Sequence, residues 1–400
     1  MGTGEITSSE RTFHEETLVF DYYPLGIPLV MDDELREMVR RRVAQGANGN
    51  AVVFEILDRT LQRIEGQSLG ARRIEEAIAR SGVNGAAVTL GDPSRPLDEW
   101  DNILDSTAWW GRMIEAIPSL VQVRSASEIE EAAASGRYAL LFVLQDGGVA
   151  KELERIEEMY RLGVRVVQLT YNRSNALGAG CAEDPSQGLT PLGREAVERM
   201  QEVGIAVDLS HCNRRTTLEG IELASAGGVP PVVTHSSCRA VYDHFRGKSD
   251  EELRAVAEAD GYFGLYLMPA FLTDEEGPNG EGPGFDPFLR HLEHAVKVLG
   301  PGRVGIGSDW GLWSPDVPSE LSEAMVDAAL KMGFTKEMGI AAGVSVGGMK
   351  DYSQWSMIID ALLRSGEWSE EEIRGFLGAN FLSYLRRVEA LTTPRFNRSG

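Results

Sequence analysis

The 400-residue sequence predicts an α/β fold of the (β/α)₈ barrel class, and three observations support this prediction. Eight short runs of β-branched and aliphatic residues recur along the chain, helical patterns separate most of them, and polar residues cluster directly after the runs. This alternation is typical of parallel strands covered by helices, with functional side chains at the carboxyl ends of the strands. The runs lie at 17–21, 83–90, 138–144, 164–171, 204–211, 231–236, 261–268 and 303–309.

Helical patterns fill the intervals between these runs. Three of them, at 32–44, 52–64 and 71–80, occupy the first interval, so the first crossover is long and forms an outer layer. The first helix has Asp32 or Asp33 as its N-cap and an apolar face at spacings of three and four residues. Further helices are predicted at 101–116, 126–134, 149–162, 191–203, 214–226, from 249 onward, at 288–299, at 351–364 and at 369–389.

No linker and no internal repeat interrupts this series, so residues 1–400 are interpreted as one catalytic barrel domain, with 1–16 and 392–400 as flexible termini. The second-ranked fold is a doubly wound open sheet. Such a sheet usually carries a glycine-rich phosphate turn after its first strand, and the turn at Tyr22, Tyr23 and Pro24 has no glycine.

Composition excludes several classes of function. The formal charge is −22, which repels nucleic-acid phosphates and anionic lipid surfaces, so neither nucleic acid nor membrane is an expected partner. No apolar run is long enough to span a bilayer, and no secretory signal is visible at the start. The three cysteines form no paired framework, which fits a reducing compartment. We therefore expect a cytoplasmic protein, and the sequence leaves open whether it forms a homodimer.

Two consecutive strands each deliver a histidine. The run 204–211 ends at His211, the run 231–236 carries His235, and the predicted helix 214–226 joins them. Asp146 and Asp309 follow the third and eighth strands, so all four side chains should meet at one mouth of a closed barrel. Two imidazoles and a carboxylate suit Zn²⁺ or a similar ion, and the second carboxylate can take a proton from water. Separate polar residues in unrelated turns are the competing interpretation.

Four segments resemble the membrane (renal) dipeptidase family of the amidohydrolase superfamily. They read QGLTPLGREAVERMQEVGIAVDLSHC from Gln187, PPVVTHSSCRAVYDHFRGKSDEEL from Pro230, RVGIGSDW from Arg303 and EEEIRGFLGANFL from Glu370. They occur in the family's order and spacing, and the resemblance extends from about Leu18 to Leu391. It implies a (β/α)₈ barrel with a two-zinc centre that hydrolyses dipeptides and commonly tolerates a D-residue on the carboxyl side.

The resemblance also implies roles for individual residues. His211 and His235 match the two histidine ligands of one metal, and Asp309 matches the eighth-strand aspartate. Arg246 matches an arginine that pairs with the substrate carboxylate, a task that suits a guanidinium group. A surface ion pair is the alternative interpretation of Arg246.

The sequence also departs from the family pattern. Tyr23 and Leu25 occupy the positions of a His-x-Asp pair that holds the other zinc, and Asp146 aligns with a bridging glutamate. Tyr171 aligns with a histidine near the substrate, so Tyr23 and Tyr171 are expected to line the pocket. The metal-binding residues that the sequence retains predict one zinc ion per chain, held by His211, His235 and Asp146, or no metal at all.

Three functions follow from these residues. The first is a metal-dependent hydrolase of an amide bond in a small dipeptide-like or N-acyl amino acid substrate that bears a carboxylate, with Asp309 as the proton shuttle and Arg246 as the carboxylate-binding group. The second is a metal-free family member that binds a small ligand or catalyses a non-hydrolytic step in a specialised biosynthetic pathway. The third, a structural or interaction protein, does not explain why polar residues group at the barrel mouth.

Overall fold

The fold was analysed in a computed structural model that describes residues 13–22, 25–67, 69–275, 282–309, 317–331, 334 and 346–392. Its centre is a nine-stranded parallel sheet in which eight strands follow one another in the order β1-β2-β4-β5-β6-β7-β8-β9. These strands are β1 Phe20–Tyr22, β2 Gly85–Thr89, β4 Tyr138–Leu144, β5 Val166–Gln168, β6 Ala206–Asp208, β7 Val232–Ser236, β8 Tyr262–Leu265 and β9 Val304–Ile306. The ninth strand, β3 Leu120–Val123, pairs with β4 outside this order.

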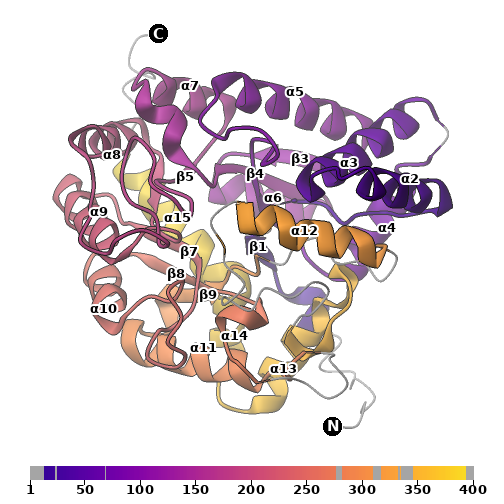
Figure 1. Cartoon of the computed structure of the whole chain (residues 1–400). Helices are drawn as coiled ribbons and strands as arrows, with labels where there is room; N and C mark the ends of the chain where they lie inside the picture. Colours follow the sequence, from indigo (N-terminus) through magenta and orange to yellow (C-terminus); the bar gives the residue numbers. More distant parts are fainter. Residues whose placement is uncertain are drawn as a thin grey trace.

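Contacts between the last and first strands bring the sheet close to a full barrel. The Asp309 backbone N–H donates to the carbonyl of Tyr22 at 3.1 Å, and the Ser308 backbone N–H donates to the Asp21 carboxylate at 2.9 Å. Figure 1 shows the strands gathered in the middle of the molecule, with helices around them. The predicted (β/α)₈ barrel is therefore confirmed.

Helices cover the outside of the barrel because each connects two parallel strands and buries one apolar face. They are α2 Asp33–Ala44, α3 Gly49–Glu65, α4 Arg72–Ser81, α5 Trp100–Ala116, α6 Ala126–Ala134, α7 Arg155–Leu162, α8 Pro191–Val203, α9 Arg214–Gly227, α10 Asp250–Glu258, α11 Asp286–Leu299, α12 Ser319–Lys331, α13 Ser356–Ser365, α14 Glu370–Arg374 and α15 Asn380–Leu391. Asp32 caps α2 through a bond from the backbone N–H of Leu35, as predicted. The long first crossover, α2 to α4, is also present.

Two predicted helices are divided. The segment predicted at 149–162 begins with a 3₁₀ turn, η1 Gly147–Lys151, and only then continues as α7. The segment predicted at 369–389 contains a π-helical turn, η8 Gly375–Ala379, between α14 and α15. Gly378 inside that turn lies against the backbone of Leu18 and Phe20, where a Cβ would be 3.0 Å from the Phe20 nitrogen. The turn therefore lets the C-terminal segment approach the first strand closely.

The barrel interior is filled by side chains and closed at one end by α15. Phe381 of α15 stacks on Phe20 of β1, and the Tyr384 hydroxyl donates to the carbonyl of Pro230 just before β7. Because Pro230 precedes β7, α15 covers the amino ends of the strands. The carboxyl ends are left for the functional site.

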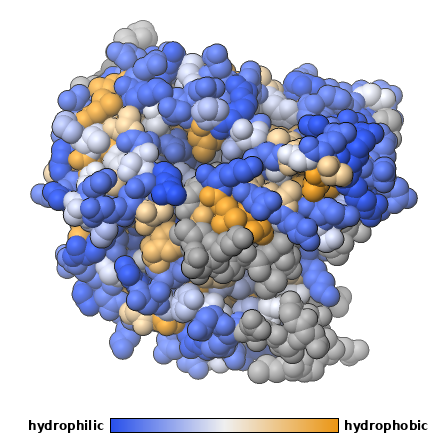
Figure 2. All heavy atoms as spheres, viewed as in Figure 1, coloured by the Kyte–Doolittle hydropathy of each residue, from blue (hydrophilic) through white to orange (hydrophobic). Residues whose placement is uncertain are grey.

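The surface in the view of Figure 2 is largely hydrophilic, with apolar residues in several small patches, one of them near its centre. Among the described residues, no helix combines the length and the apolar character that a membrane crossing requires. The one-domain prediction, with flexible ends at 1–16 and 392–400, remains a prediction; most of those terminal residues lie outside the described ranges.

Candidate functional site

Two histidines meet at the carboxyl ends of β6 and β7. The Nε2 atoms of His211 and His235 are 3.0 Å apart, and both side chains are buried. The pairing of β7 with β8 shifts by one residue between Val233 and Ser236. Such a bulge re-aims the side chains that follow it, and here it accompanies the approach of His235 to His211. A Cβ at Gly264 or Gly307 would overlap the carbonyl oxygen of Thr234, so the backbone there requires glycine in β8 and directly after β9.

The second ring nitrogen of His211 has a defined partner. Its Nδ1 lies 2.7 Å from Oδ1 of Asn172 in the segment after β5. An amide oxygen only accepts hydrogen bonds, so His211 Nδ1 carries the proton and donates it. In the neutral imidazole the lone pair is then on Nε2 and points toward His235.

The same reasoning applies to His235 through a buried carboxylate. Asp208 accepts hydrogen bonds from the backbone and hydroxyl groups of both Ser210 and Thr234. Burial raises the pKa of Asp208, whereas these four bonds lower it and stabilise the carboxylate. The single hydroxyl proton of Thr234 is thus used toward Asp208, and His235 Nδ1, 2.8 Å from Thr234 Oγ1, must donate. His235 therefore also has its lone pair on Nε2.

Two unprotonated Nε2 atoms 3.0 Å apart repel each other, and a cation bound by both lone pairs would remove that repulsion. Burial, reinforced by the positive charge of Arg246, holds the pKa of both histidines well below the usual value. Neutral imidazoles whose Nδ1–H groups are fixed by neighbouring acceptors are the usual form of histidine metal ligands. The pair therefore fits one divalent metal ion.

Asp146, the expected third ligand, has other partners. Its Oδ1 accepts from the backbone N–H of Gly148 at 2.8 Å and from the Asn175 amide at 2.7 Å, so it caps η1. Burial raises its pKa. Within the described ranges, no group of three or more His, Cys, Asp or Glu side chains is arranged to hold a metal. The histidine pair supplies two donors, and the described residues do not assemble the two-metal set that the resemblance implies.

Two tyrosines flank the histidines. The Tyr171 ring stacks on His211 with centroids 4.3 Å apart, and the Tyr22 ring stacks on His235 at 5.1 Å. Tyr171 thus lies at the site, where the sequence predicted a pocket-lining residue. Tyr23 lies outside the described residues. Leu25, at the other first-strand ligand position, is partly buried and carries no donor atom.

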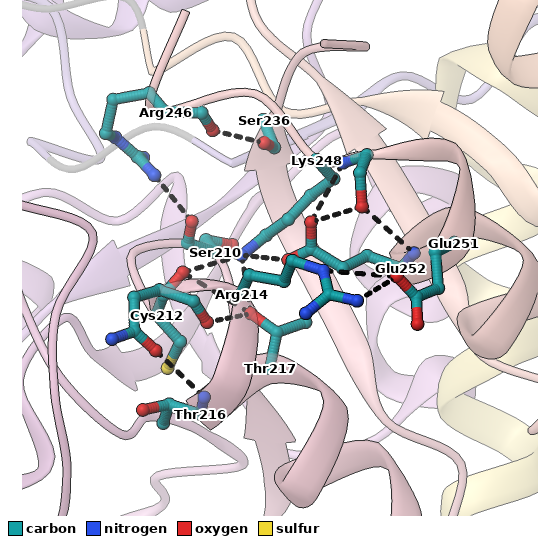
Figure 3. A network of polar contacts seen from close by, with 12 residues as sticks. Ser210, Cys212, Arg214, Thr216, Thr217, Ser236, Arg246, Lys248, Glu251 and Glu252 are labelled. Atoms are coloured by element: carbon teal, nitrogen blue, oxygen red, sulfur yellow. Dashed lines mark hydrogen bonds and ion pairs between the residues drawn. The ribbon is translucent and has the colours of Figure 1, made fainter. Parts of the chain in front are cut away.

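Arg246 lies next to the histidine pair and is 1% exposed. Its Nη1 donates to the carbonyl of Ser210, as Figure 3 shows, and its guanidinium carbon is 5.2 Å from the centroid of the Tyr266 ring. Nε and Nη2 are buried and make no hydrogen bond of normal geometry to a described residue, with the Cys181 thiol as a weak acceptor nearby. These two N–H groups form the edge of a guanidinium that binds a carboxylate through two parallel bonds. The surface ion pair considered for Arg246 is not what the structure shows.

The loop that carries Arg246 is fixed by a neighbouring buried cation, Lys248. Its Nζ donates to the carbonyl of Cys212 at 2.9 Å and to the Thr217 hydroxyl at 2.8 Å, and it is 3.7 Å from Glu252 (Figure 3). The Ser236 hydroxyl donates to the carbonyl of Arg246 itself. Arg246 is therefore held from β7, from the segment after β6 and from α10.

Asp309 follows β9 and has a left-handed backbone, with φ of 45°. Burial raises the pKa of Asp309 to about 7, with Arg246 lowering it and Asp21 raising it further. A non-glycine residue in this conformation is costly and is found mostly where the surrounding structure imposes it. Asp309 is thus a carboxyl group that exchanges a proton near neutral pH at the barrel mouth.

Several residues of the site were not singled out from the sequence. Asn172 directly follows the predicted strand-end Tyr171, and Asp208 lies two residues before the end of the run 204–211, so both had a positional signal. Thr234 and Tyr266 belong to apolar runs and have no such signal. Their roles come from the bulge in β7 and from contacts between strands.

Comparisons with known proteins identify the family to which this chain is similar. The model of the membrane dipeptidase family (peptidase family M19) matches residues 58–330. An uncharacterized dipeptidase of Schizosaccharomyces pombe is 33% identical over 158 residues, which are 39% of this chain and only 37% of that protein. An amidohydrolase from Pseudomonas aeruginosa has a similar structure, with a TM-score of 0.70 and 22% identity over 95% of this chain and 98% of that one.

A metallo peptidase from Rhodobacter sphaeroides, whose structure contains a phosphinate mimic of the dipeptide L-Ala-D-Ala, has a TM-score of 0.64 and 20% identity over 93% of this chain and 100% of that one. At these identities the two structures show the fold alone. The family model, in contrast, covers well over half of the sequence, including both histidines, Arg246 and Asp309. The chain therefore belongs to the membrane dipeptidase family.

Proposed function

We propose that this protein hydrolyses the amide bond of a small dipeptide-like or N-acyl amino acid substrate with a free carboxylate, using a single zinc ion. The observation that carries the proposal is the placement of two facing Nε2 lone pairs beside the unpartnered edge of the Arg246 guanidinium. The first arrangement calls for a cation and the second for a carboxylate. A dipeptide at a metal centre satisfies both.

His211 and His235 would hold the ion, with Asp146 as the proposed third ligand. A bound zinc ion would act as a Lewis acid that polarises the scissile carbonyl. We propose one ion and not two because Leu25 offers no donor and Asp146 Oδ1 is engaged by Gly148 and Asn175, so this carboxylate has one oxygen for a metal and cannot bridge two.

The other residues bind the substrate and move protons. Arg246 holds the substrate carboxylate through Nε and Nη2 and so fixes the position of the scissile bond. Asp309 accepts the proton of the attacking water and returns it to the leaving amine, for which a pKa of about 7 is well suited. Tyr171 would line the substrate pocket beside His211, and Tyr23 keeps its expected role in the same pocket.

A dipeptide substrate is also consistent with family membership and with the L-Ala-D-Ala mimic in the Rhodobacter sphaeroides structure. We further propose a cytoplasmic location and no nucleic-acid or membrane partner, in keeping with the charge of −22. Homodimer formation remains open to a measurement of mass in solution.

The test is elemental analysis of protein purified without chelators, together with hydrolysis of L-Ala-D-Ala. We expect no more than one zinc per chain, loss of activity after chelation and its return with added zinc. Two stoichiometric ions would show that another group replaces the missing first-strand ligands. Metal-free protein that still binds carboxylate ligands would instead support the non-hydrolytic alternative.

A further inference from the structure

Tyr266 lies next to both His235 and Arg246. It directly follows β8, and its backbone N–H donates to the carbonyl of Ser236 at the end of β7. Its ring centroid is 5.5 Å from that of His235, 5.2 Å from the guanidinium carbon of Arg246 and 5.1 Å from the ring of Phe271. The side chain is fully buried.

The position of Tyr266 on its strand directs the side chain toward the mouth. The side chain of Tyr262, four residues earlier, points to the same face of the sheet and packs against Phe381 and Tyr384 at the closed end of the barrel. Four residues of strand advance the chain by about 13 Å. Tyr266 therefore belongs to the layer of interior side chains that lies nearest the site.

The Tyr266 hydroxyl is buried and has no hydrogen-bond partner in the part of the chain that the structure describes. Two other buried tyrosines do have one: the Tyr352 hydroxyl donates to Asp21 at 3.0 Å and the Tyr384 hydroxyl to Pro230 at 2.9 Å. A buried hydroxyl without a partner is unfavourable. Arg246, in contact with the same ring, has two further unpartnered donors. Arg246 Nε, Arg246 Nη2 and the Tyr266 hydroxyl are thus three adjacent donor groups without a hydrogen-bond partner among the described residues.

We infer that Tyr266 is a second carboxylate-binding residue of the substrate site, its hydroxyl donating to the same carboxylate that Arg246 holds. This inference rests on the proposed function and deepens it. A carboxylate has lone pairs for all three donors, whereas the nitrogen of a C-terminal amide cannot accept a hydrogen bond. The site should therefore select ligands with a free carboxyl-terminal group over their amides, and Tyr266 should contribute to that selection.

The experiment compares L-Ala-D-Ala with its C-terminal amide. Binding is measured by calorimetry on the full-length, zinc-loaded protein carrying Asp309→Asn, so that neither ligand is turned over. Adding Tyr266→Phe should lower the affinity for L-Ala-D-Ala by about tenfold, as expected for the loss of one hydrogen bond to a charged group. The affinity for the amide should change by less than about twofold. Tyr384→Phe, which removes a partnered hydroxyl at the opposite end of the barrel, should change neither affinity.

Thermal unfolding of the ligand-free variants gives an independent test, because the two substitutions should have different effects on the unfolding midpoint. Tyr266→Phe should leave the midpoint unchanged or raise it, because the hydroxyl has no partner to lose, whereas Tyr384→Phe should lower it. Equal weakening of both ligands, or a midpoint lowered as much as by Tyr384→Phe, would overturn the inference. If wild-type protein hydrolyses no dipeptide and the Asp309→Asn parent binds neither ligand, the proposed function itself fails, and the role of Tyr266 fails with it.

Discussion

At the scale of single residues, Asp309 combines a strained backbone with a carboxyl group that titrates near neutrality. Its φ of 45° is held by the hydrogen bond from its own N–H to Tyr22 and by the bonds from Ser308 to Asp21. Strain of this kind persists where the structure fixes both neighbours. The carboxyl group thus has a defined position and a pKa matched to proton transfer.

We predict that kcat/KM rises with pH up to about 7 and is level above it. The active form of a general base is the deprotonated one, and burial places the pKa of Asp309 at about 7, so activity is lost as the pH falls below that value. Asp309→Asn should lower kcat by roughly 10²–10⁴-fold, and the residual activity should no longer rise with pH. A rise that persists in the variant would assign the titration to another group.

Arg246→Lys should discriminate between ligands by their charge. Lysine keeps the positive charge but loses the two parallel N–H donors, so binding of a carboxylate ligand should weaken by about 1.5–3 kcal/mol. An amidated analogue should bind wild type and variant about equally. If both ligands weaken alike in an inhibition assay, Arg246 supports the loop and does not recognise the carboxylate.

The residues that could be predicted are those whose position follows from the strand pattern alone. His211, His235 and Asp309 are recognisable because polar groups directly follow apolar runs, and the structure brings the two histidines together. The cap role of Asp146 and the unpartnered Tyr266 hydroxyl could not be predicted, because they depend on Asn175 and on neighbouring strands. Such contacts leave no periodic signal in the sequence.

At the scale of elements, the loop between β7 and α10 fixes Arg246. Ser249 and Glu252 form a capping box at the start of α10, and the backbone N–H of Lys248 donates to the carbonyl of Ser237. Arg214 at the start of α9 pairs with Glu251 of α10, which joins the two helices (Figure 3). The loop is therefore supported at both ends and by the buried Lys248 in between.

We predict that Lys248→Met destabilises the protein by about 2–4 kcal/mol in urea unfolding. The substitution keeps the length of the side chain but leaves Glu252 buried without its cation and the Cys212 carbonyl without its donor. The control is Arg254→Met, which removes an exposed pair with Asp250 and should cost less than about 0.5 kcal/mol. Equal losses in the two variants would contradict a structural role for the buried lysine.

All eight predicted barrel strands are present, and the elements missed from the sequence have weak patterns. The strand β3 has only four residues and two of them are partly exposed. The helix α12 buries only Leu321 and Ala328, so its apolar face is narrow. Its position against α3 depends on a backbone contact, because a Cβ at Gly49 would lie 2.6 Å from the Ala324 carbonyl. A contact between distant backbones cannot be read from local periodicity.

At the scale of the whole molecule, one buried carboxylate joins the first strand to segments more than 280 residues later in the chain. Asp21 on β1 accepts from the Ser308 backbone and hydroxyl, from the Tyr352 hydroxyl at 3.0 Å and from the Trp355 indole at 3.2 Å. These partners are 287 to 334 residues away in the sequence. Asp21 therefore holds the eighth barrel strand and the segment before α13 against the first strand.

Asp21→Asn tests this closure, and we predict a loss of about 2–4 kcal/mol in the free energy of unfolding. An asparagine has one acceptor oxygen in place of two, and its NH₂ group would face donors where an acceptor is required. Asp33→Asn makes the same chemical change at a fully exposed position on α2 and should cost less than about 0.5 kcal/mol.

The same variant should also affect the site, because the bonds from Ser308 to Asp21 precede Asp309 in the chain. Removing the Asp21 charge takes away one of the causes that raise the pKa of Asp309, so the midpoint of the pH profile should move to lower pH. A variant as stable as wild type, with the same midpoint, would mean that the β9 to β1 contact forms without the carboxylate. Barrel closure and the position of Asp309 would then depend on the backbone hydrogen bond to Tyr22 alone, and the pKa of Asp309 would not depend on Asp21.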